Sequence, residues 1–91
     1  MGPETGGQAR KSGSARAVLA ANVVALRRSK GWSQEALAFE CGLHRTFVAH
    51  VERQVRNIAI DNIEKLALAL GTEPYELLKP AITAAGARTD R

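Results

Sequence analysis

Apolar residues recur at helical spacing from about residue 15 to residue 80. Leu19, Val23 and Leu26 follow the i, i+4, i+7 positions of one helix face, and Gly31 is a suitable stop for that helix. No alternation of apolar and polar residues is long enough to indicate a strand. The pattern therefore predicts an all-α chain whose first helix runs from about residue 15 to residue 30.

Two short helices are predicted next, on either side of a turn at residues 41–43. Ser33 suits the N-cap of the first of them, and Gly42 suits its end. The second runs from His44 to about Arg53. The residues expected to face inward from this pair and its turn are Leu37, Ala38, Cys41, Leu43, Val48 and Val51.

A loop over residues 54–60 separates this pair from a fourth helix. Asp61 and Glu64 have the spacing of a capping box, and Gly71 marks the end of the helix. Pro74 fits the first position of a last short helix, residues 74–79. The inward residues of the fourth helix are expected to be Ile63, Leu66, Ala67 and Leu70.

The five predicted helices form one compact domain over residues 15–80. Residues 1–14 are rich in glycine, serine and charge without apolar periodicity, and residues 81–91 are similar, so we expect a disordered leader and tail. A chain of 91 residues is too short for a two-domain enzyme. It has neither a membrane-spanning apolar run nor a signal peptide, so a cytoplasmic protein without membrane partners is predicted.

The positive charge is concentrated in one part of the chain. Residues 10–56 hold nine Lys and Arg against three Glu, a net charge of +6, whereas residues 57–91 have a net charge of −1. This distribution favours a polyanionic partner for the first half. Charge that serves only solubility is the alternative.

The chain offers little material for catalysis or metal binding. It has one cysteine, Cys41, and two histidines, so neither an internal disulfide nor a zinc cage is expected. Free cysteine commonly packs as a small apolar residue, and we expect this role here. There is no acidic cluster and no phosphate-binding glycine loop, so we predict no enzyme activity, no metal, no cofactor and no small-molecule ligand.

The two short helices together meet the requirements of a helix-turn-helix. Such a motif needs a small residue at the helix crossing, a turn residue that tolerates positive φ, and apolar residues that hold the second helix at a steep angle. Ala38 and Gly42 meet the first two requirements. Leu37, Leu43, Val48 and Val51 meet the third. An ordinary helical hairpin can meet any one of these requirements by chance. Because this chain meets all three, a helix-turn-helix is favoured.

These residues also carry a family resemblance. The chain resembles the Cro and lambda-repressor-like, XRE-type helix-turn-helix family over about residues 17–79. The resemblance rests on the runs Gly31–Ala38, Gly42–Val48, Val51–Arg53 and Asn62–Ala67. The stretch Gly42–Leu70 is similar to the controller proteins of restriction-modification systems. The resemblance implies a five-helix lambda-repressor-like domain that binds DNA as a small stand-alone dimer.

The resemblance further implies that the helix from His44 lies in the major groove of DNA. The outward residues of this helix, and so the candidates for base contacts, are Arg45, Thr46, Ala49 and His50. Arg45 can contact guanine through two hydrogen bonds, which contribute about 1–3 kcal/mol of discrimination. A solvated helix face is the alternative for Arg45 and His50.

Phosphate contacts are expected around the same helix, from Gln34, Arg53, Arg56 and Asn57. A glutamine at the position of Gln34 clamps the DNA backbone in the family, near free N–H groups of a helix start. The others follow the recognition helix and would set its register. Family members usually have glycine where this chain has Gln54, so the following loop either keeps a left-handed turn or is rearranged.

The resemblance implies one structural ion pair and one function. Arg27 and Glu52 are expected to form a partly buried salt bridge. The predicted function is sequence-specific binding of double-stranded DNA by a homodimeric transcription regulator on a roughly palindromic operator. The dimer surface is expected at Tyr75, Leu77, Leu78 and Ile82, although Leu77 or Leu78 can equally complete the core.

Two other functions remain open from the sequence. The same fold can serve an antitoxin or another partner-binding regulator whose DNA binding is secondary. A helical protein–protein interaction module without DNA function is the alternative from a different class.

Overall fold

The structure is a computed structural model that describes residues 13–80. Its helices are α2 (Ala15–Ser29), α3 (Gln34–Cys41), α4 (Arg45–Glu52), α5 (Ile60–Leu70) and α6 (Pro74–Leu77). Between residues 13 and 80 there is no strand, so the predicted all-α architecture of five helices is confirmed. The predictions for residues 1–12 and 81–91 lie outside the described residues.

Serine side chains begin the first two helices. Ser33 accepts a hydrogen bond from the backbone N–H of Ala36 over 3.0 Å, as the sequence predicts. Ser14, which the sequence analysis assigned to the leader, accepts from the N–H of Ala17 over 3.1 Å and is the N-cap of α2. The ordered domain therefore begins before residue 15.

The turn between α3 and α4 has the geometry expected of its glycine. Gly42 has φ +73°, and the N–H of the next residue, Leu43, donates to the carbonyl of Ala38 over 2.9 Å. The expectation that Leu43 enters the core is wrong, because its side chain is only half-buried. It lines a surface hollow with Phe39 and Arg45, since the left-handed turn directs it to the edge of the helix pair.

Two further boundaries differ from prediction. α5 begins at Ile60 after Ala59, which has extended backbone angles, so Asp61 lies inside the first turn and is not the cap. There its negative charge suits the N-terminal end of the helix dipole. α6 ends at Leu77, shorter than predicted, because Leu78 already departs from helical angles.

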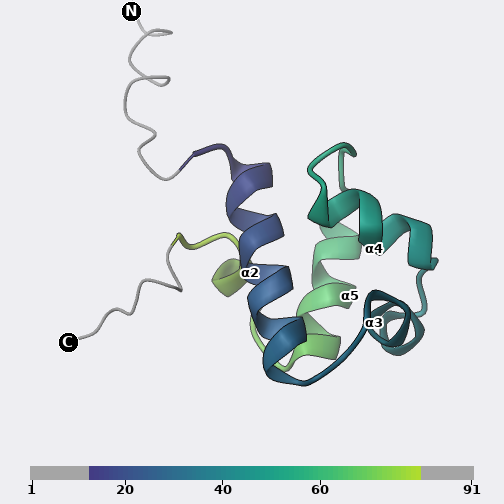
Figure 1. Cartoon of the computed structure of the whole chain (residues 1–91). Helices are drawn as coiled ribbons and strands as arrows, with labels where there is room; N and C mark the ends of the chain where they lie inside the picture. The colour runs from purple at the N-terminus through teal and green to yellow at the C-terminus, as the bar shows by residue number, and fades with distance from the viewer. Residues whose placement is uncertain (1–12, 81–91) are drawn as a thin grey trace, which may run out of the picture.

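The five helices share one core. α3 and α4 pack against each other, α4 packs against α2 and α3 against α5, while α6 returns to both α2 and α5 (Figure 1). The largest fully buried side chains are Leu37, Leu66, Leu77, Val23 and Val48. Where apolar residues follow the i, i+3, i+4 spacing, the helix contributes its predicted inward residues to the core. α4 is held in this shared core by one face only.

A buried amide joins the two ends of the described domain. Asn22 of α2 is 2% exposed, and its Nδ2 donates to the carbonyls of Leu77 over 2.9 Å and Lys79 over 2.8 Å. These carbonyls lie at and beyond the end of α6, where the helix leaves them without partners of its own. Asn22 therefore fixes α6 on α2, a role that its helix-face position alone does not reveal.

Candidate nucleic-acid interface

α4 presents one apolar face and one polar face. Val48 and Val51 are buried in the core, and they hold the helix from beneath. On the opposite face Arg45 and Thr46 are exposed. Ala49 and His50, the other two candidates for base contact, are half-buried. The exposed polar surface of α4 is therefore concentrated in its first turn.

The ion pair predicted between α2 and α4 is present. Arg27 Nε lies 2.7 Å from Glu52 Oε2, and Arg27 Nη2 donates to Glu52 Oε1 over 3.0 Å. The two side chains are 12% and 7% exposed, so the pair is largely removed from solvent. Arg27 Nη1 also donates to the carbonyl of Trp32 over 2.8 Å. Because the guanidinium binds both the Glu52 carboxylate and the Trp32 carbonyl, it links α2 to α4 and to the turn before α3.

Gln34 takes part in the same network. Its Nε2 donates to Glu52 Oε1 over 2.8 Å, and its side chain is half-buried. The family resemblance predicts a phosphate contact for Gln34, but nothing in the sequence indicates its bond to Glu52. The bond to Glu52 uses one N–H of the Gln34 side-chain amide. The second N–H of this amide remains as a donor beside the N-terminus of α3.

α4 ends in a left-handed turn although Gln54 stands where family members usually have glycine. Gln54 has φ +63°, so it adopts the left-handed turn despite its side chain. Its N–H donates to the carbonyl of Val51 over 3.0 Å, and the N–H of Val55 donates to the carbonyl of His50 over 3.1 Å. These two bonds form a Schellman motif, the same helix ending that glycines provide after α3 and α5.

The loop after α4 contains three of the predicted phosphate contacts. Arg53 and Arg56 are exposed. The guanidinium of Arg56 lies 5.3 Å from the ring centroid of Phe47. Asn57 Oδ1 accepts a hydrogen bond from Arg16 of α2. Sequence spacing did not indicate Arg16 or Phe47 as partners, because both contacts depend on how the loop folds back.

The surface predicted for dimer contacts needs one correction. Leu77 is 0% exposed and completes the core, because α6 packs this residue against α2 and α5. Tyr75 is 62% and Leu78 41% exposed. Ile82 lies outside the described residues.

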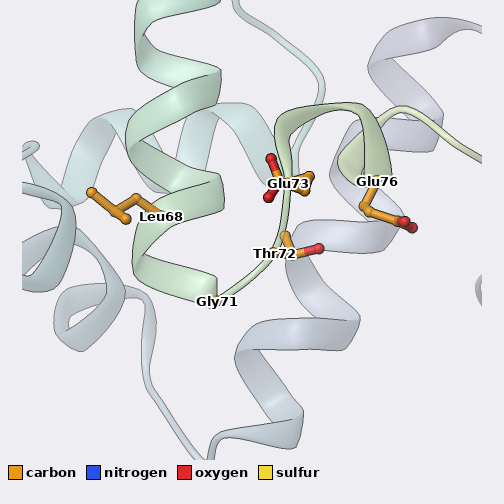
Figure 2. A pocket seen from close by; sticks show the side chains of 5 residues that line it. All are labelled: Leu68, Gly71, Thr72, Glu73 and Glu76. Atoms are coloured by element: carbon orange, nitrogen blue, oxygen red, sulfur yellow. The ribbon is translucent and has the colours of Figure 1, made fainter.

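Leu68 of α5 is a further exposed apolar residue, at 83% exposure. Leu68 lines a hollow of about 350 Å³ together with Gly71, Thr72, Glu73 and Glu76. Figure 2 shows these five residues. Leu68 lies between the inward residues Leu66 and Leu70, and this outward position was the sequence signal for an apolar surface that our prediction left out.

The remaining chemistry of the domain is limited. Burial raises the pKa of the Cys41 thiol from 9.0 to about 11, with a further increase from Glu40 and an opposing effect of Lys65. Such a thiol is largely protonated at neutral pH, which suits a packing role. Among residues 13–80, no group of three or more His, Cys, Asp or Glu is placed to hold a metal ion. None of the described helices is long and apolar enough to cross a membrane.

A short helix held from beneath, with an exposed polar first turn and a preceding helix packed across it, defines a helix-turn-helix DNA-binding domain. Residues 23–77 match the family described as helix-turn-helix. The chain belongs to this helix-turn-helix family, of the XRE or lambda-repressor-like type.

Two relatives have similar sequences. A hypothetical transcription factor of Neisseria meningitidis serogroup B is 60% identical over 65 residues, which are 71% of this chain and 61% of that protein. The control protein C.BamHI of Bacillus amyloliquefaciens is 56% identical over 54 residues, which are 58% of this chain and 67% of that protein. This chain therefore spans less than two thirds of the Neisseria relative.

Two solved structures have the same fold. The crystal structure of the hypothetical transcription factor NHTF from Neisseria superposes with a TM-score of 0.74 at 55% identity, over 78% of this chain and 82% of that chain. The restriction-modification controller protein C.AhdI from Aeromonas hydrophila superposes with a TM-score of 0.66 at 48% identity, over 68% of this chain and 94% of that chain. The resemblance found in the sequence is thereby confirmed.

Proposed function

We propose that this protein binds a specific double-stranded DNA operator as a transcription regulator of the restriction-modification controller type. The exposed first turn of α4, held from beneath by Val48 and Val51, is the observation that carries the proposal. The similarity to the control protein C.BamHI and the controller protein C.AhdI supports the subgroup. A cytoplasmic location and the absence of enzyme activity belong to the same proposal.

Base recognition is assigned mainly to Arg45 and Thr46. Both side chains are exposed in the first turn of α4, where a recognition helix approaches base edges. Arg45 suits guanine, whose O6 and N7 accept two hydrogen bonds from one guanidinium. Ala49 and His50 are half-buried, so their contacts would come from close approach of the helix to the groove.

Phosphate binding is assigned to residues that flank α4. The free N–H of the Gln34 amide and the Nδ2 group of Asn57 are hydrogen-bond donors. Arg53 and Arg56 are exposed cations. Contacts of this kind position the protein on the duplex and make its affinity fall steeply with salt.

A homodimer on a roughly palindromic operator completes the proposal, because one helix-turn-helix buries too little DNA surface for tight specific binding. The exposed apolar residues Leu68, Tyr75 and Leu78 support a pairing surface around α5 and α6. Sedimentation should show a dimer at micromolar concentration that Leu68→Glu dissociates. A monomer at high micromolar concentration would refute this assignment.

The function can be tested by selecting bound sequences from random duplex DNA. The wild-type protein is expected to enrich one roughly palindromic site. Arg45→Ala should relax the preference at one position of each half-site and weaken binding about 5- to 150-fold. Lys30→Ala, which removes a charge that lies over the Trp32 ring at the far end of α2, is the control and should select the wild-type site. Failure of the wild type to enrich any site rules out sequence-specific regulation.

A further inference from the structure

The left-handed turn at Gln54 sends the chain back along α4. Through this reversal the guanidinium of Arg56 lies 5.3 Å from the ring centroid of Phe47, a residue in the first turn of the same helix. A cation within about 6 Å of an aromatic ring is attracted by the negative face of the ring. A loop residue is therefore joined to the turn of α4 that also carries Arg45 and Thr46.

Of the two partners, Phe47 is the fixed one. Its side chain is half-buried and packs against the core, and its N–H donates to the carbonyl of His44 over 2.9 Å. Arg56 is exposed. The position of the ring is thus decided by the helix and the core, and the ring in turn decides where the long arginine side chain lies.

The loop is also held from the opposite side. Asn57, the residue after Arg56, accepts a hydrogen bond from Arg16 of α2. Ile58, the next residue, packs against the core. Arg56 therefore projects from a backbone that is anchored before it by the turn at Gln54 and after it by Asn57 and Ile58.

We propose that Phe47 is a positioning residue that holds Arg56 ready for a DNA phosphate before the duplex arrives. The inference rests on the proposed function. An unrestrained arginine loses side-chain freedom when it binds, and a side chain already held in place loses less. The ordering cost of one such side chain corresponds to about a two- to tenfold difference in affinity.

A double-mutant cycle on the selected operator tests this role. Phe47→Leu, which removes the ring but keeps an apolar side chain, should weaken binding about two- to tenfold. In the Arg56→Ala background the same change should have no further effect, because the side chain that Phe47 positions is gone. Phe47→Tyr keeps the ring and should bind as the wild type does. Equal effects of Phe47→Leu in both backgrounds would overturn the proposal.

Arg53→Ala is the matched control, since it removes the same charge from the same end of α4. Phe47→Leu should retain its full effect in that background. Arg56→Ala should also reduce the slope of log affinity against log salt by about 0.9, the loss of one phosphate contact, whereas Phe47→Leu should leave the slope unchanged. All measurements are made well below the unfolding temperature of each variant, so that loss of folding does not contribute.

A DNA-free measurement separates failure of this proposal from failure of the proposed function. In the nuclear magnetic resonance spectrum of the free protein, the ring current of Phe47 should shift the Arg56 δ-methylene protons upfield. Phe47→Leu should abolish the shift, and Phe47→Tyr should keep it. Unshifted protons in the wild type refute the positioning role. Failure of the wild type to select any duplex refutes the proposed function, whatever the shift.

Discussion

The side-chain amide of Asn22 reaches the backbone carbonyl of Leu77 over 2.9 Å, joining residues 55 positions apart. The same amide group donates to the carbonyl of Lys79, so one buried side chain satisfies two acceptors at the end of the domain. This bond sets how α6 lies on α2. With α6 in this position, Leu77 faces the core while Tyr75 and Leu78 remain exposed.

Asn22→Ala should therefore be strongly destabilising. Removal of the amide leaves buried carbonyls without a donor, and each such group costs about 1–3 kcal/mol. We expect a loss of about 2–4 kcal/mol in the free energy of unfolding, measured by urea denaturation. Asn62→Ala, at a half-buried amide near the start of α5, serves as control and should cost less than 1 kcal/mol or so. Equal losses for the two variants would contradict the role assigned to Asn22.

Glu52→Ala should lose DNA binding chiefly by unfolding. The change leaves the Arg27 guanidinium largely buried without its counter-charge, which costs about 3–5 kcal/mol, and it also removes the acceptor of Gln34. Thermal denaturation should show a lowered midpoint. Glu35→Ala, at an exposed glutamate of α3, should change the stability by less than about 1 kcal/mol. An unchanged midpoint for Glu52→Ala would show that the ion pair contributes nothing to folding.

Gln54→Gly should stabilise the protein. A non-glycine residue at φ +63° has its Cβ close to the following carbonyl, at a cost of about 1–2 kcal/mol. Part of the gain is lost because glycine is more flexible in the unfolded chain, so we expect a net stabilisation of about 0.5–1 kcal/mol. Calorimetry should show a midpoint several degrees higher. Gln54→Ala retains the Cβ and should not raise the unfolding midpoint. If it raised the midpoint as much as Gln54→Gly does, the strain would come from the glutamine side chain and not from the Cβ.

The Cys41 thiol should react slowly at pH 8 and faster as the pH approaches 11. Burial raises the pKa of this thiol from 9.0 to about 11, so the thiolate is scarce at pH 8. Because the folded state holds its proton more strongly than the unfolded state, the stabilising effect is complete below pH 9 and is lost between about pH 9 and pH 11.

The pH dependence of Cys41 is measured by alkylation rates and by denaturation at each pH. Cys41→Ala is the control for stability, since it lacks the titrating group but has the same lysines and tyrosine. The difference in stability between wild type and Cys41→Ala should decline over this window. A constant difference from pH 8 to pH 11 would show that the thiol has an ordinary pKa in the folded state.

Local signals in the sequence determined most of the helices and much of the motif. Ser33 begins α3, Gly42 ends it, and Val48 and Val51 face inward, because caps and apolar spacing act over one or two turns. The pairing of Arg27 with Glu52 came from the family resemblance, and the structure contains it. Asp61 shows the limit of local patterns, since its capping-box spacing did not decide where α5 begins.

Only the tertiary structure decided the contacts that join distant parts of the chain. Leu77 is core and Leu68 is surface, although both are leucines in apolar helices, because burial depends on which neighbouring helix covers each position. The bonds from Asn22 to Leu77 and from Arg16 to Asn57 span 55 and 41 residues, and no local pattern encodes them. The sequence by itself thus determined a helix-turn-helix. The fold determined how its surroundings hold α4, since long-range packing selects one partner for each side chain among many that the sequence allows.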